Sequence, residues 1–486
     1  MDFLPDITIV YQIFAGLIFI NTVGAIITVF RKPRSIASVL AWLVTLTFLP
    51  GLGFLLYAFC GRGIDGDIIY RFEERHQKRI SEINEAIANH NEQFPKDHLS
   101  TDVLLLENYF KAMEESPVTK GNQVDFFTDG QAKFEALFAD IRAAKNNVHV
   151  EYYAFFKDKI GTKFLNLLVE KAQQGVEVRL LFDPWGANSN MKFFKPLVEA
   201  GGKVVPFITS RNLIRKTRLN YHLHRKIVVI DGQIAWTGGF NVGDQYLEVT
   251  KEFGYWRDTH ARIVGTASFS LQEIFLRDWN ASVMHKADML EYETNYFVIP
   301  EEKGDVMLQI VADGPETEDQ VLRGGFIKML LDAKERVWIQ SPYLIPDDSM
   351  ITALLIAVRS GVDVRIMIPN KPDHPFIYRA TQYYANYLQQ RGVKIYLYEG
   401  GFIHAKTILM DEAIGSFGTT NQDIRSYDLN FEVSAFAYDK EVTQQLAHFF
   451  EKDMENSTFL TTEMIKNQSY WLKFKQNFSR LLSPIL

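Results

Sequence analysis

The chain contains the same group of polar residues twice, with 180 positions between the copies (224 and 404). The first copy reads H-R-K-I-V-V-I-D and the second reads H-A-K-T-I-L-M-D, and the spacing continues downstream to an asparagine and a glutamate. The residues are His224, Lys226, Asp231, Asn241 and Glu252 in the first copy, and His404, Lys406, Asp411, Asn421 and Glu432 in the second. Paired imidazoles and paired ammonium groups can cleave a phosphodiester through a covalent intermediate.

Each residue type in the repeated group has a separate task in such a reaction. A phosphodiester is anionic and resists attack, so the two lysines, helped by the two asparagine amides, would neutralise the developing charge. One neutral imidazole can attack phosphorus and form a phosphohistidine, while the other, protonated, donates to the leaving alcohol and later takes the proton of the incoming alcohol. A carboxylate behind each ring can fix its tautomer, and Glu252 and Glu432 are the candidates. The chemistry requires no metal, and the sequence contains no evident compact cluster of metal ligands.

The aspartates of the two copies have a different expected role. His224 and Lys226 are two positions apart, so they point to the same side of a strand. Asp231 has the opposite parity, and the pair Asp231-Gly232 is a turn signal between two predicted strands, RKIVVI and QIAWTG. We therefore expect Asp231, and by the same argument Asp411, to fix a turn or a buried partner rather than to touch substrate.

The elements around the repeated group also occur twice. From about residue 125, helical patterns such as FEALFADIRAAK alternate with apolar strand patterns such as NVHVEYYAFF and VEVRLLFD. The second half repeats this order with the strands RVWIQSPY, VDVRIMIP and VKIYLYEG. Each half is therefore predicted to be an α/β unit with a mostly parallel sheet. Duplicated units commonly face one another across a pseudo-two-fold axis, which would bring both copies to one cleft.

The N-terminal region is predicted to be a helical transmembrane anchor. Residues 7–30 and 35–61 carry no charge, and the first segment would span roughly 36 Å as a helix. A cleaved signal peptide fits less well because the apolar run is long and acidic residues precede it. The sequence L-P-G-L-G at 49–53 interrupts the second segment, so either two spans or one span with a re-entrant hairpin is possible. The basic residues after position 61 favour a cytoplasmic location for the rest of the chain.

These patterns together predict five regions. They are a membrane anchor (1–61), a helical connector exposed to solvent (62–120), two α/β domains (121–300 and 301–460) and an amphipathic C-terminal helix (461–486). The last region mixes aromatic residues with Lys and Arg, which suits a membrane interface, although packing against the catalytic part is an equal alternative. A basic stretch before the first copy could bind anionic lipid head groups or be an ordinary solvated loop; its residues are Arg211, Arg215, Lys216 and Arg218.

The amino-acid composition excludes some classes of protein and some kinds of site. The net charge is −7, which argues against a general nucleic-acid-binding protein. Apolar residues make up 47% of the chain, enough for well-filled cores. Cys60 is the only cysteine, which excludes an intrachain disulfide and a zinc cluster built on thiolates.

The repeated group resembles the signature H-x-K-x-x-x-x-D of the phospholipase D superfamily. Within that superfamily the chain is similar to bacterial cardiolipin synthases over essentially its whole length. The similarity includes two N-terminal hydrophobic segments, G-Y-W-R-D-T-H (254–260), S-P-Y-L-I-P (341–346) and N-Q-D-I-R-S-Y-D-L-N-F-E (421–432). A small departure is Gly418-Thr419, where the superfamily often has Gly-Ser; threonine keeps the hydroxyl.

The resemblance implies transfer of a phosphatidyl group from one phosphatidylglycerol to another, which yields cardiolipin and glycerol without a cofactor. It implies a bacterial plasma-membrane protein that binds anionic lipids. It also implies that one histidine is the nucleophile, with His224 favoured and His404 as acid and base, and it counts Asp231 and Asp411 among the signature positions. A lipid-hydrolysing phospholipase D and a phosphatidylserine synthase would use the same residues. A nuclease is disfavoured by the acidic charge, and an inactive membrane scaffold by the intact His-Lys pairs.

Overall fold

The protein is described by a computed structural model that covers residues 7–30, 36–49, 52–57, 80–94, 101–113, 117–186, 190–207, 221–247, 254–283, 285–300, 304–317 and 319–481. The chain divides into two compact units. Of the described residues, those from 7 to 57 and Tyr221 belong to the first unit, and the others belong to the second. Both copies of the repeated group lie in the second unit, so the two predicted α/β domains are parts of one compact body.

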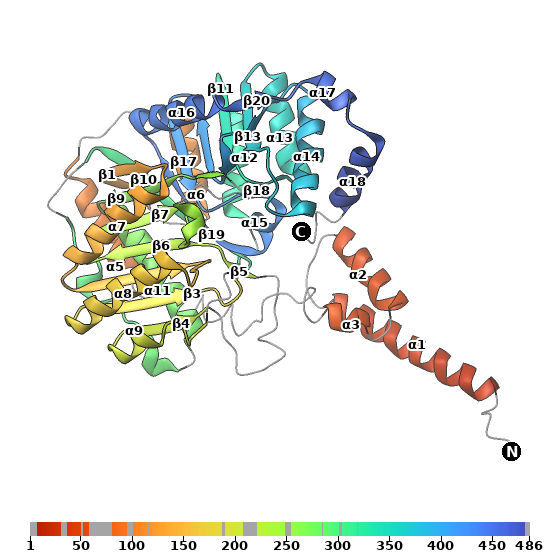
Figure 1. Ribbon diagram of the computed structural model, residues 1–486, viewed down its shortest axis with the longest axis horizontal. Helices are drawn as coiled ribbons and strands as arrows, with labels where there is room; N and C mark the ends of the chain where they lie inside the picture. Colours follow the sequence, from red (N-terminus) through yellow and green to blue (C-terminus); the bar gives the residue numbers. More distant parts are fainter. Residues whose placement is uncertain are drawn as a thin grey trace. The chain divides into compact units, whose positions relative to one another are not determined.

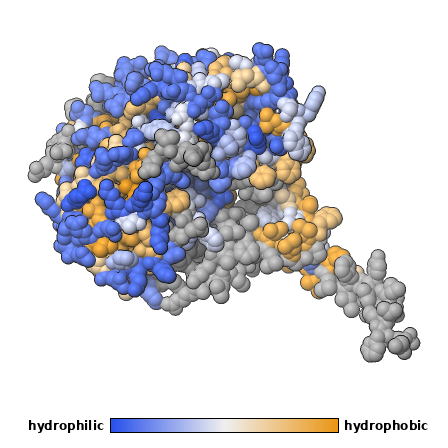
Figure 2. Space-filling model, viewed as in Figure 1, coloured by the Kyte–Doolittle hydropathy of each residue, from blue (hydrophilic) through white to orange (hydrophobic). Residues whose placement is uncertain are grey.

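The described part of the first unit contains three apolar helices, α1 (Ile7–Phe30), α2 (Ile36–Phe48) and α3 (Leu52–Leu56). Most of their described side chains are hydrophobic, as the colours of Figure 2 show. The Asn21 side chain donates a hydrogen bond of 2.6 Å to the Leu46 carbonyl, which ties α1 to α2. The gap between α2 and α3 falls at the predicted interruption of the second hydrophobic segment. No helix in the described part of the chain is long and apolar enough to cross a membrane. The transmembrane anchor thus remains a prediction.

One large mixed sheet organises the second unit (Figure 1). The first half supplies β1 (Thr119–Phe127), β2 (Asn147–Tyr152), β3 (Glu177–Phe182), β4 (Lys203–Pro206), β5 (His222–Leu223), β6 (Lys226–Ile230), β7 (Ile234–Gly238) and β9 (His260–Val264). The second half supplies β10 (Val306–Asp313), β11 (Arg336–Gln340), β13 (Asp363–Pro369), β14 (Lys394–Tyr398), β16 (Thr407–Met410), β17 (Ile414–Gly418), β19 (Asn430–Ala437) and β20 (Ser457–Phe459). Four short strands lie outside it: β8 (Tyr255–Arg257) pairs with β15 (Gly401–Ile403), and β12 (Leu344–Ile345) with β18 (Gln422–Asp423).

The strand order of the sheet displays the internal duplication. It runs β20-β14-β13-β11-β16-β17-β19-β10-β1-β9-β7-β6-β2-β3-β4, with β5 joined to β19 off this path. Outward from the central pair, β10-β19-β17-β16-β11-β13-β14 has the same order of elements as β1-β9-β7-β6-β2-β3-β4. The central strands β1 and β10 run antiparallel, so the halves are related by a pseudo-two-fold axis at the middle of the sheet.

The prediction of mostly parallel sheets was wrong for the centre of the molecule. Parallel pairing is confined in this sheet to β2-β3-β4, β11-β13-β14 and the short β5-β19 pair; the other neighbouring strands in the order given above are antiparallel. The helix-strand alternation before each repeated group does produce parallel crossovers. Each repeated group itself opens a hairpin, β6-β7 or β16-β17, and a connection of three residues is too short for a parallel crossover, so the two strands are antiparallel.

Helices cover both faces of the sheet. The first half contributes α7 (Gly130–Ala143), α8 (Lys159–Gln173), α9 (Lys195–Glu199) and α11 (Ala267–Ser282), and the second half α12 (Val321–Asp332), α13 (Asp348–Arg359), α14 (Pro375–Gln389), α15 (Ile424–Asp428) and α16 (Lys440–Met454). Alternate residues of β6 face different cores: Val228 and Ile230 pack with α7 and α8, whereas Ile227 and Val229 pack with α11. The strand of the first repeated group is thus buried on both faces, which fixes its register.

The segment predicted as a solvated connector is part of the second unit, and its helices pack into the cores of that unit. It contains α5 (Ile80–Asn91) and α6 (Thr101–Ala112). Val103, Leu106 and Phe110 of α6 are buried in the core of the second half, and Ile83 and Ile87 of α5 pack with a residue of α11. The apolar spacing of these helices was thus a signal for burial that the charged run before them obscured. The chain ends with α17 (Thr462–Lys466) and α18 (Tyr470–Leu481), and α18 lies beside α14 (Figure 1).

Candidate active site

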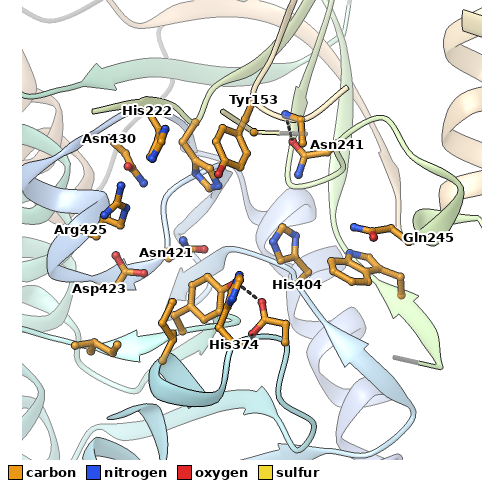
Figure 3. Close-up of a pocket in the computed structure, with 18 of the residues that line it drawn as sticks. Tyr153, His222, Asn241, Gln245, His374, His404, Asn421, Asp423, Arg425 and Asn430 are labelled. Carbon is orange, nitrogen blue, oxygen red and sulfur yellow. Dashed lines mark hydrogen bonds between the residues drawn. The ribbon is translucent and has the colours of Figure 1, made fainter. Parts of the chain in front are cut away.

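Both histidines of the repeated group line the same cavity, of about 390 Å³, in the second unit. Figure 3 shows residues of the two halves around it, with Asn241 and Gln245 from the first half and His404, Asn421 and Asp423 from the second. Its lining residues are Tyr153, Ala154, Phe156, Gly186, His222, His224, Asn241, Gln245, Tyr246, Trp256, Tyr343, Ile345, Asp373, His374, Ile377, His404, Asn421, Asp423, Ile424, Arg425 and Asn430. The duplication therefore brings the two copies to one site, as the sequence predicted.

The backbone of each histidine is held by the opposite half of the protein. In the first copy, β5 pairs in parallel with the start of β19, and the His224 amide donates to the Phe431 carbonyl at 3.0 Å. In the second copy, β15 pairs in parallel with β8, and the His404 amide donates to the Arg257 carbonyl at 2.7 Å. These two short strand pairings between the halves position one imidazole from each half in the cavity.

A carboxylate from the opposite half contacts each imidazole. Glu432 lies with both side-chain oxygens 2.9 Å from His224 Nδ1, and Asp258 lies with Oδ2 2.6 Å from His404 Nδ1. Both carboxylates are fully buried. With Nδ1 bound in this way, Nε2 of each ring remains for a substrate.

Asp258, rather than Glu252, is the counterpart of Glu432. The strand register demonstrates the equivalence: Gly238 pairs with His260 and Gly418 pairs with Ser434, and these partners lie two positions after Asp258 and Glu432. The sequence match at a constant spacing of 180 failed here because the loop before β8 differs in length from its counterpart before β19. Glu252 itself lies outside the described residues. An alanine lies three positions after each carboxylate, in D-T-H-A and E-V-S-A, and this shared alanine could have indicated from the sequence that Asp258 corresponds to Glu432.

Polar neighbours hold Glu432 in its ionised form. Thr419 Oγ1 donates to it at 2.5 Å, and Asn430 Nδ2 donates at 3.2 Å. Burial alone would raise the pKa of Glu432, but the interactions with His224, Lys226 and Thr419 outweigh burial and leave the pKa below its ordinary value. The hydroxyl that Thr419 supplies in place of the superfamily's serine is thus used as a donor to this carboxylate.

The histidines and lysines of the repeated group are buried, and burial lowers the pKa of all four side chains. Burial lowers the pKa of His224 and of His404 to about 4, although Glu432 and Asp258 act in the opposite direction. Both rings are therefore neutral at neutral pH, and an anionic phosphate beside one of them would raise its pKa. Burial also lowers the pKa of Lys226 to about 7 and of Lys406 to about 8, so a rise in pH above neutrality removes their charge.

Each lysine lies against its own histidine. Lys226 Nζ donates to the His224 carbonyl and Lys406 Nζ donates to the His404 carbonyl, both at 2.6 Å. Each lysine is buried, and the charge of each lowers the pKa of the histidine in its own copy. Each ammonium group therefore lies beside the backbone of its own histidine, although neither lysine is among the residues that line the cavity.

The side chains of the two asparagines differ in their hydrogen bonds. Asn241 accepts from the Ala154 amide at 3.2 Å and donates to the Tyr246 hydroxyl at 3.1 Å, so it is held rigidly at the cavity wall. Asn421 also lines the cavity, and its Oδ1 is buried with no hydrogen-bond partner in the part of the chain that the structure describes. Asn421 Oδ1 is thus an acceptor that a donor of a bound ligand, such as a head-group hydroxyl, could satisfy.

The surroundings of the two histidines are unlike, although the repeated groups match. His224 makes an edge-on ring contact with Tyr153, and the neighbouring lining residues His222 and Asn430 are polar. His404 lies beside the rings of Trp256 and Phe402, at centroid distances of 5.2 and 6.2 Å. These neighbours were not predicted, because most of them come from strands and loops outside the repeated group.

The aspartates of the signature lie away from the cavity and bind backbone. Asp231 accepts hydrogen bonds of 2.7–2.9 Å from the amides of Lys145, Asn146 and Asn147. Asp411 accepts bonds of 2.8–3.1 Å from the amides of three residues that precede or begin β11, namely Lys334, Glu335 and Arg336. Both aspartates have positive φ, 51° and 53°, at the hairpin turns. The parity argument was correct, and a role for either aspartate in contact with substrate is not supported.

The substitution Asp231→Asn is expected to lower stability and to leave the chemistry intact. A neutral amide loses the charge-assisted bonds to three backbone amides, which should lower the free energy of unfolding by about 1–3 kcal/mol. Denaturant unfolding would measure this loss, with activity determined per folded molecule. A large loss of activity in a fully folded variant would contradict the structural role.

One further group of predicted residues cannot be placed. The basic stretch that contains Arg211, Arg215, Lys216 and Arg218 lies outside the described residues. Among the residues that the structure describes, no group of three or more His, Cys, Asp or Glu side chains could hold a metal ion.

Comparisons with known proteins agree with this architecture. The family described as "Cardiolipin synthase, PLD-like domain" matches residues 137–279 and 326–454, and the family "Phospholipase_D-nuclease N-terminal" matches residues 20–62. A cardiolipin synthase of Listeria monocytogenes serotype 4b is 44% identical, over 97% of this chain and 98% of the relative. The major cardiolipin synthase of Bacillus subtilis is 42% identical, over 98% of this chain and 99% of the relative.

A solved structure shares the fold at much lower identity. The phosphatidylserine synthase of Haemophilus influenzae superimposes with a TM-score of 0.59 at 15% identity, covering 79% of this chain and 100% of that one. The family match covers both halves that supply the cavity, and the two relatives extend over nearly the full chain. This chain therefore belongs to the cardiolipin synthase family of phospholipase D-like phosphatidyltransferases.

Proposed function

We propose that this protein transfers a phosphatidyl group from one phosphatidylglycerol molecule to another, which yields cardiolipin and glycerol. The observation that carries the proposal is the pair of histidines in one cavity, each with Nδ1 bound by a carboxylate of the opposite half. The family membership supplies the substrate class.

In the first step, Nε2 of His224 attacks phosphorus of the donor lipid. The bond between phosphorus and the head-group glycerol oxygen breaks as the phosphorus–nitrogen bond forms. His404, protonated when the phosphate is bound, donates the Nε2 proton to the departing glycerol oxygen. The products are free glycerol and a phosphatidyl group attached to His224. We assign His224 as the nucleophile from the resemblance to the superfamily.

In the second step, the glycerol hydroxyl of another phosphatidylglycerol attacks the same phosphorus. His404 removes its proton, the phosphorus–nitrogen bond breaks, and cardiolipin leaves with both imidazoles returned to their starting forms. Lys226 and Lys406 stabilise the charge that develops on the phosphate oxygens in both steps, and the Asn421 amide is placed to contribute. Glu432 and Asp258 stabilise the Nδ1–H tautomer of their rings and any imidazolium that forms.

The direct test is incubation of the purified protein with phosphatidylglycerol labelled in its head group. Cardiolipin together with an equal amount of free labelled glycerol is expected. Phosphatidic acid as the main lipid product would instead identify the protein as a lipid-hydrolysing phospholipase D, in which water attacks in the second step. Addition of serine and a nucleotide-linked lipid tests the phosphatidylserine synthase alternative in the same assay.

The pH dependence of kcat/KM should reflect the charge of the buried lysines. Lys226 and Lys406, with pKa values of about 7 and 8, bind the phosphate only when protonated, so kcat/KM should fall as the pH rises through this range. In Lys226→Arg the charge persists to high pH, so the alkaline fall should move upward even though the rate is lower. A profile that stays flat to pH 9 in the wild-type protein would contradict the role of the lysines.

We further propose that the protein is a multi-pass protein of the cell membrane with the catalytic unit in the cytoplasm. Support comes from the uncharged segments 7–30 and 35–61 and from the family match over residues 20–62. The basic residues Arg211, Arg215, Lys216 and Arg218 would bind anionic lipid head groups. Cysteines introduced in a Cys60→Ser background at Pro33 and Lys120 test the topology. Labelling from opposite sides eliminates a re-entrant hairpin, and labelling from the same side eliminates two spans.

A further inference from the structure

The C-terminal helix α18 is oriented with its polar side inward and its aromatic side outward. Gln476 and Ser479 are each only 2% exposed. The outward side chains, which we call the aromatic row, are Tyr470 (93% exposed), Trp471 (63%), Phe474 (57%), Phe478 (47%) and Leu481 (73%). A surface helix of a soluble protein normally has the opposite arrangement, with its apolar stripe on the core. The outward face of α18 is therefore suited to an apolar environment.

Polar contacts attach α18 to α14. Asn386 donates from Nδ2 to Gln476 Oε1 at 3.2 Å, Gln476 donates in turn to Gln382 Oε1 at 3.5 Å, and the Arg480 guanidinium lies 4.9 Å from the Tyr383 ring centroid. The helix is thus held in place by its polar side. Removal of the aromatic row would leave these contacts intact.

The rings of the aromatic row are stacked along the helix. Trp471 and Phe474 lie 5.3 Å apart between centroids with an interplanar angle of 8°, and Phe474 and Phe478 lie 6.3 Å apart at 20°. They form one continuous apolar strip rather than isolated exposed residues. Continuous exposed strips of this kind mark interaction surfaces.

The charge around the aromatic row identifies the partner as an anionic lipid surface. Lys466, Lys473, Lys475 and Arg480 lie in or just before α18, and no Asp or Glu follows Glu463 in the sequence. This basic segment belongs to a chain whose net charge is −7. Aromatic residues flanked by Lys and Arg are typical of helices that lie in the plane of a membrane interface.

The contacts between the two helices also connect α18 to an element of the active site. Gln476 bonds to Asn386 and Gln382, and Arg480 lies on Tyr383, so α18 packs against the part of α14 between residues 382 and 386. At its beginning the same helix α14 borders the cavity, which His374 and Ile377 line. Phe376 lies between those two residues and is 53% exposed, which adds an apolar side chain near the cavity.

We propose that the aromatic row of α18 inserts into the interface of an anionic bilayer and holds the active-site cavity at the level of the lipid head groups. Its benefit for catalysis rests on the proposed function, since a phospholipid substrate must enter from the membrane. The contact with lipid itself does not depend on the transfer chemistry. The two can therefore be tested separately.

A dye at one position of the aromatic row measures insertion directly. The full chain, in a Cys60→Ser background, carries Phe474→Cys or, as control, Glu170→Cys on the exposed side of α8, each labelled with an environment-sensitive fluorophore. In vesicles of phosphatidylglycerol and phosphatidylcholine, the dye at 474 should shift to shorter wavelength and be quenched by brominated lipid at least roughly twice as strongly as the control dye. Because the N-terminal segments would retain both proteins on the vesicle, the difference reports local insertion.

Three outcomes of the dye experiment overturn the proposal. Equal quenching at 474 and 170 shows that the aromatic row stays in water. A shift that depends on protein concentration and occurs without lipid shows that a second copy of the chain covers the aromatic row. A shift equal in anionic and in pure phosphatidylcholine vesicles removes the part assigned to the basic residues. The same measurement in His224→Ala requires no turnover, so it remains valid if the proposed transferase activity is wrong.

A combined variant then measures the consequence for activity. Trp471→Ser, Phe474→Ser and Phe478→Ser together should raise KM for vesicle phosphatidylglycerol about tenfold, with kcat/KM for a monomeric short-chain analogue and the Tm unchanged. The matched control removes three exposed apolar side chains elsewhere, with Val198→Ser, Leu331→Ser and Ile356→Ser, and should leave KM unchanged. An equal rise in KM for both variants, or an equal loss on the monomeric analogue, would reject the proposal.

Discussion

Alanine in place of either His224 or His404 is expected to lower cardiolipin formation by at least about 10⁴-fold. Loss of His224 removes the atom that carries the phosphatidyl group, and loss of His404 removes the proton donor for glycerol. The measurement is turnover of head-group-labelled phosphatidylglycerol, with thermal unfolding as a check that each variant is folded. His448→Ala, at an exposed position on α16 outside the cavity, is the matched control and should keep wild-type turnover.

A donor with a better leaving group separates the two histidines. Phosphatidyl-p-nitrophenol needs no proton donor in the first step, so His404→Ala should release a burst of nitrophenol equal to the amount of enzyme and then stop. His224→Ala should release none. The reverse result would assign the nucleophile to His404, and a burst in neither variant, with both proteins folded, would argue against a covalent phosphohistidine.

The carboxylates that cross between the halves should have the second-largest effect. Glu432→Gln and Asp258→Asn are each expected to lower kcat by about 10²–10⁴-fold, because an amide does not stabilise the imidazolium and can select the wrong tautomer. KM should change much less, since neither carboxylate is among the residues that line the cavity. A loss confined to KM would contradict a positioning role behind the ring.

Two comparisons make this prediction specific to the structure. Glu252→Gln should retain nearly wild-type turnover if Asp258 is the true counterpart of Glu432. A loss as large as that of Asp258→Asn would instead indicate that Glu252 is the counterpart, as the constant spacing of 180 residues predicted. The double variant Glu432→Gln with His224→Ala should be no slower than His224→Ala alone, because the carboxylate acts through that ring. Additive losses would mean that Glu432 has an independent function.

Much of the local structure followed from the sequence. The duplicated helix-strand order predicted two equivalent halves, and the structure has the same strand order on each side of β1 and β10. The parity of Asp231 and the D-G pair predicted a hairpin turn, and residues 231–233 form the turn between β6 and β7, with positive φ angles at Asp231 and Gly232. These features depend on short-range geometry, which residue spacing specifies.

Features that depend on contacts between distant segments were predicted less well. The mixed character of the sheet was missed because strand direction depends on which strands become neighbours. The burial of α6 was missed because its partner core is built from residues of the second half, which follow only from Met307 onward in the chain. The polar attachment of α18 to α14 could not be distinguished from a conventional amphipathic helix, because periodicity gives the faces of a helix without indicating which face is covered.

The sequence by itself determined the chemical groups of this protein: two imidazoles, two ammonium groups and two asparagine amides in a repeated order, with His and Lys two positions apart in each copy. Only the tertiary structure decided that each imidazole is bound by a carboxylate of the other half, and that the partner of His404 is Asp258. The physical reason is that counting along a chain includes every loop residue, whereas β8 and β15, like β5 and β19, align by backbone hydrogen bonds that ignore loop length.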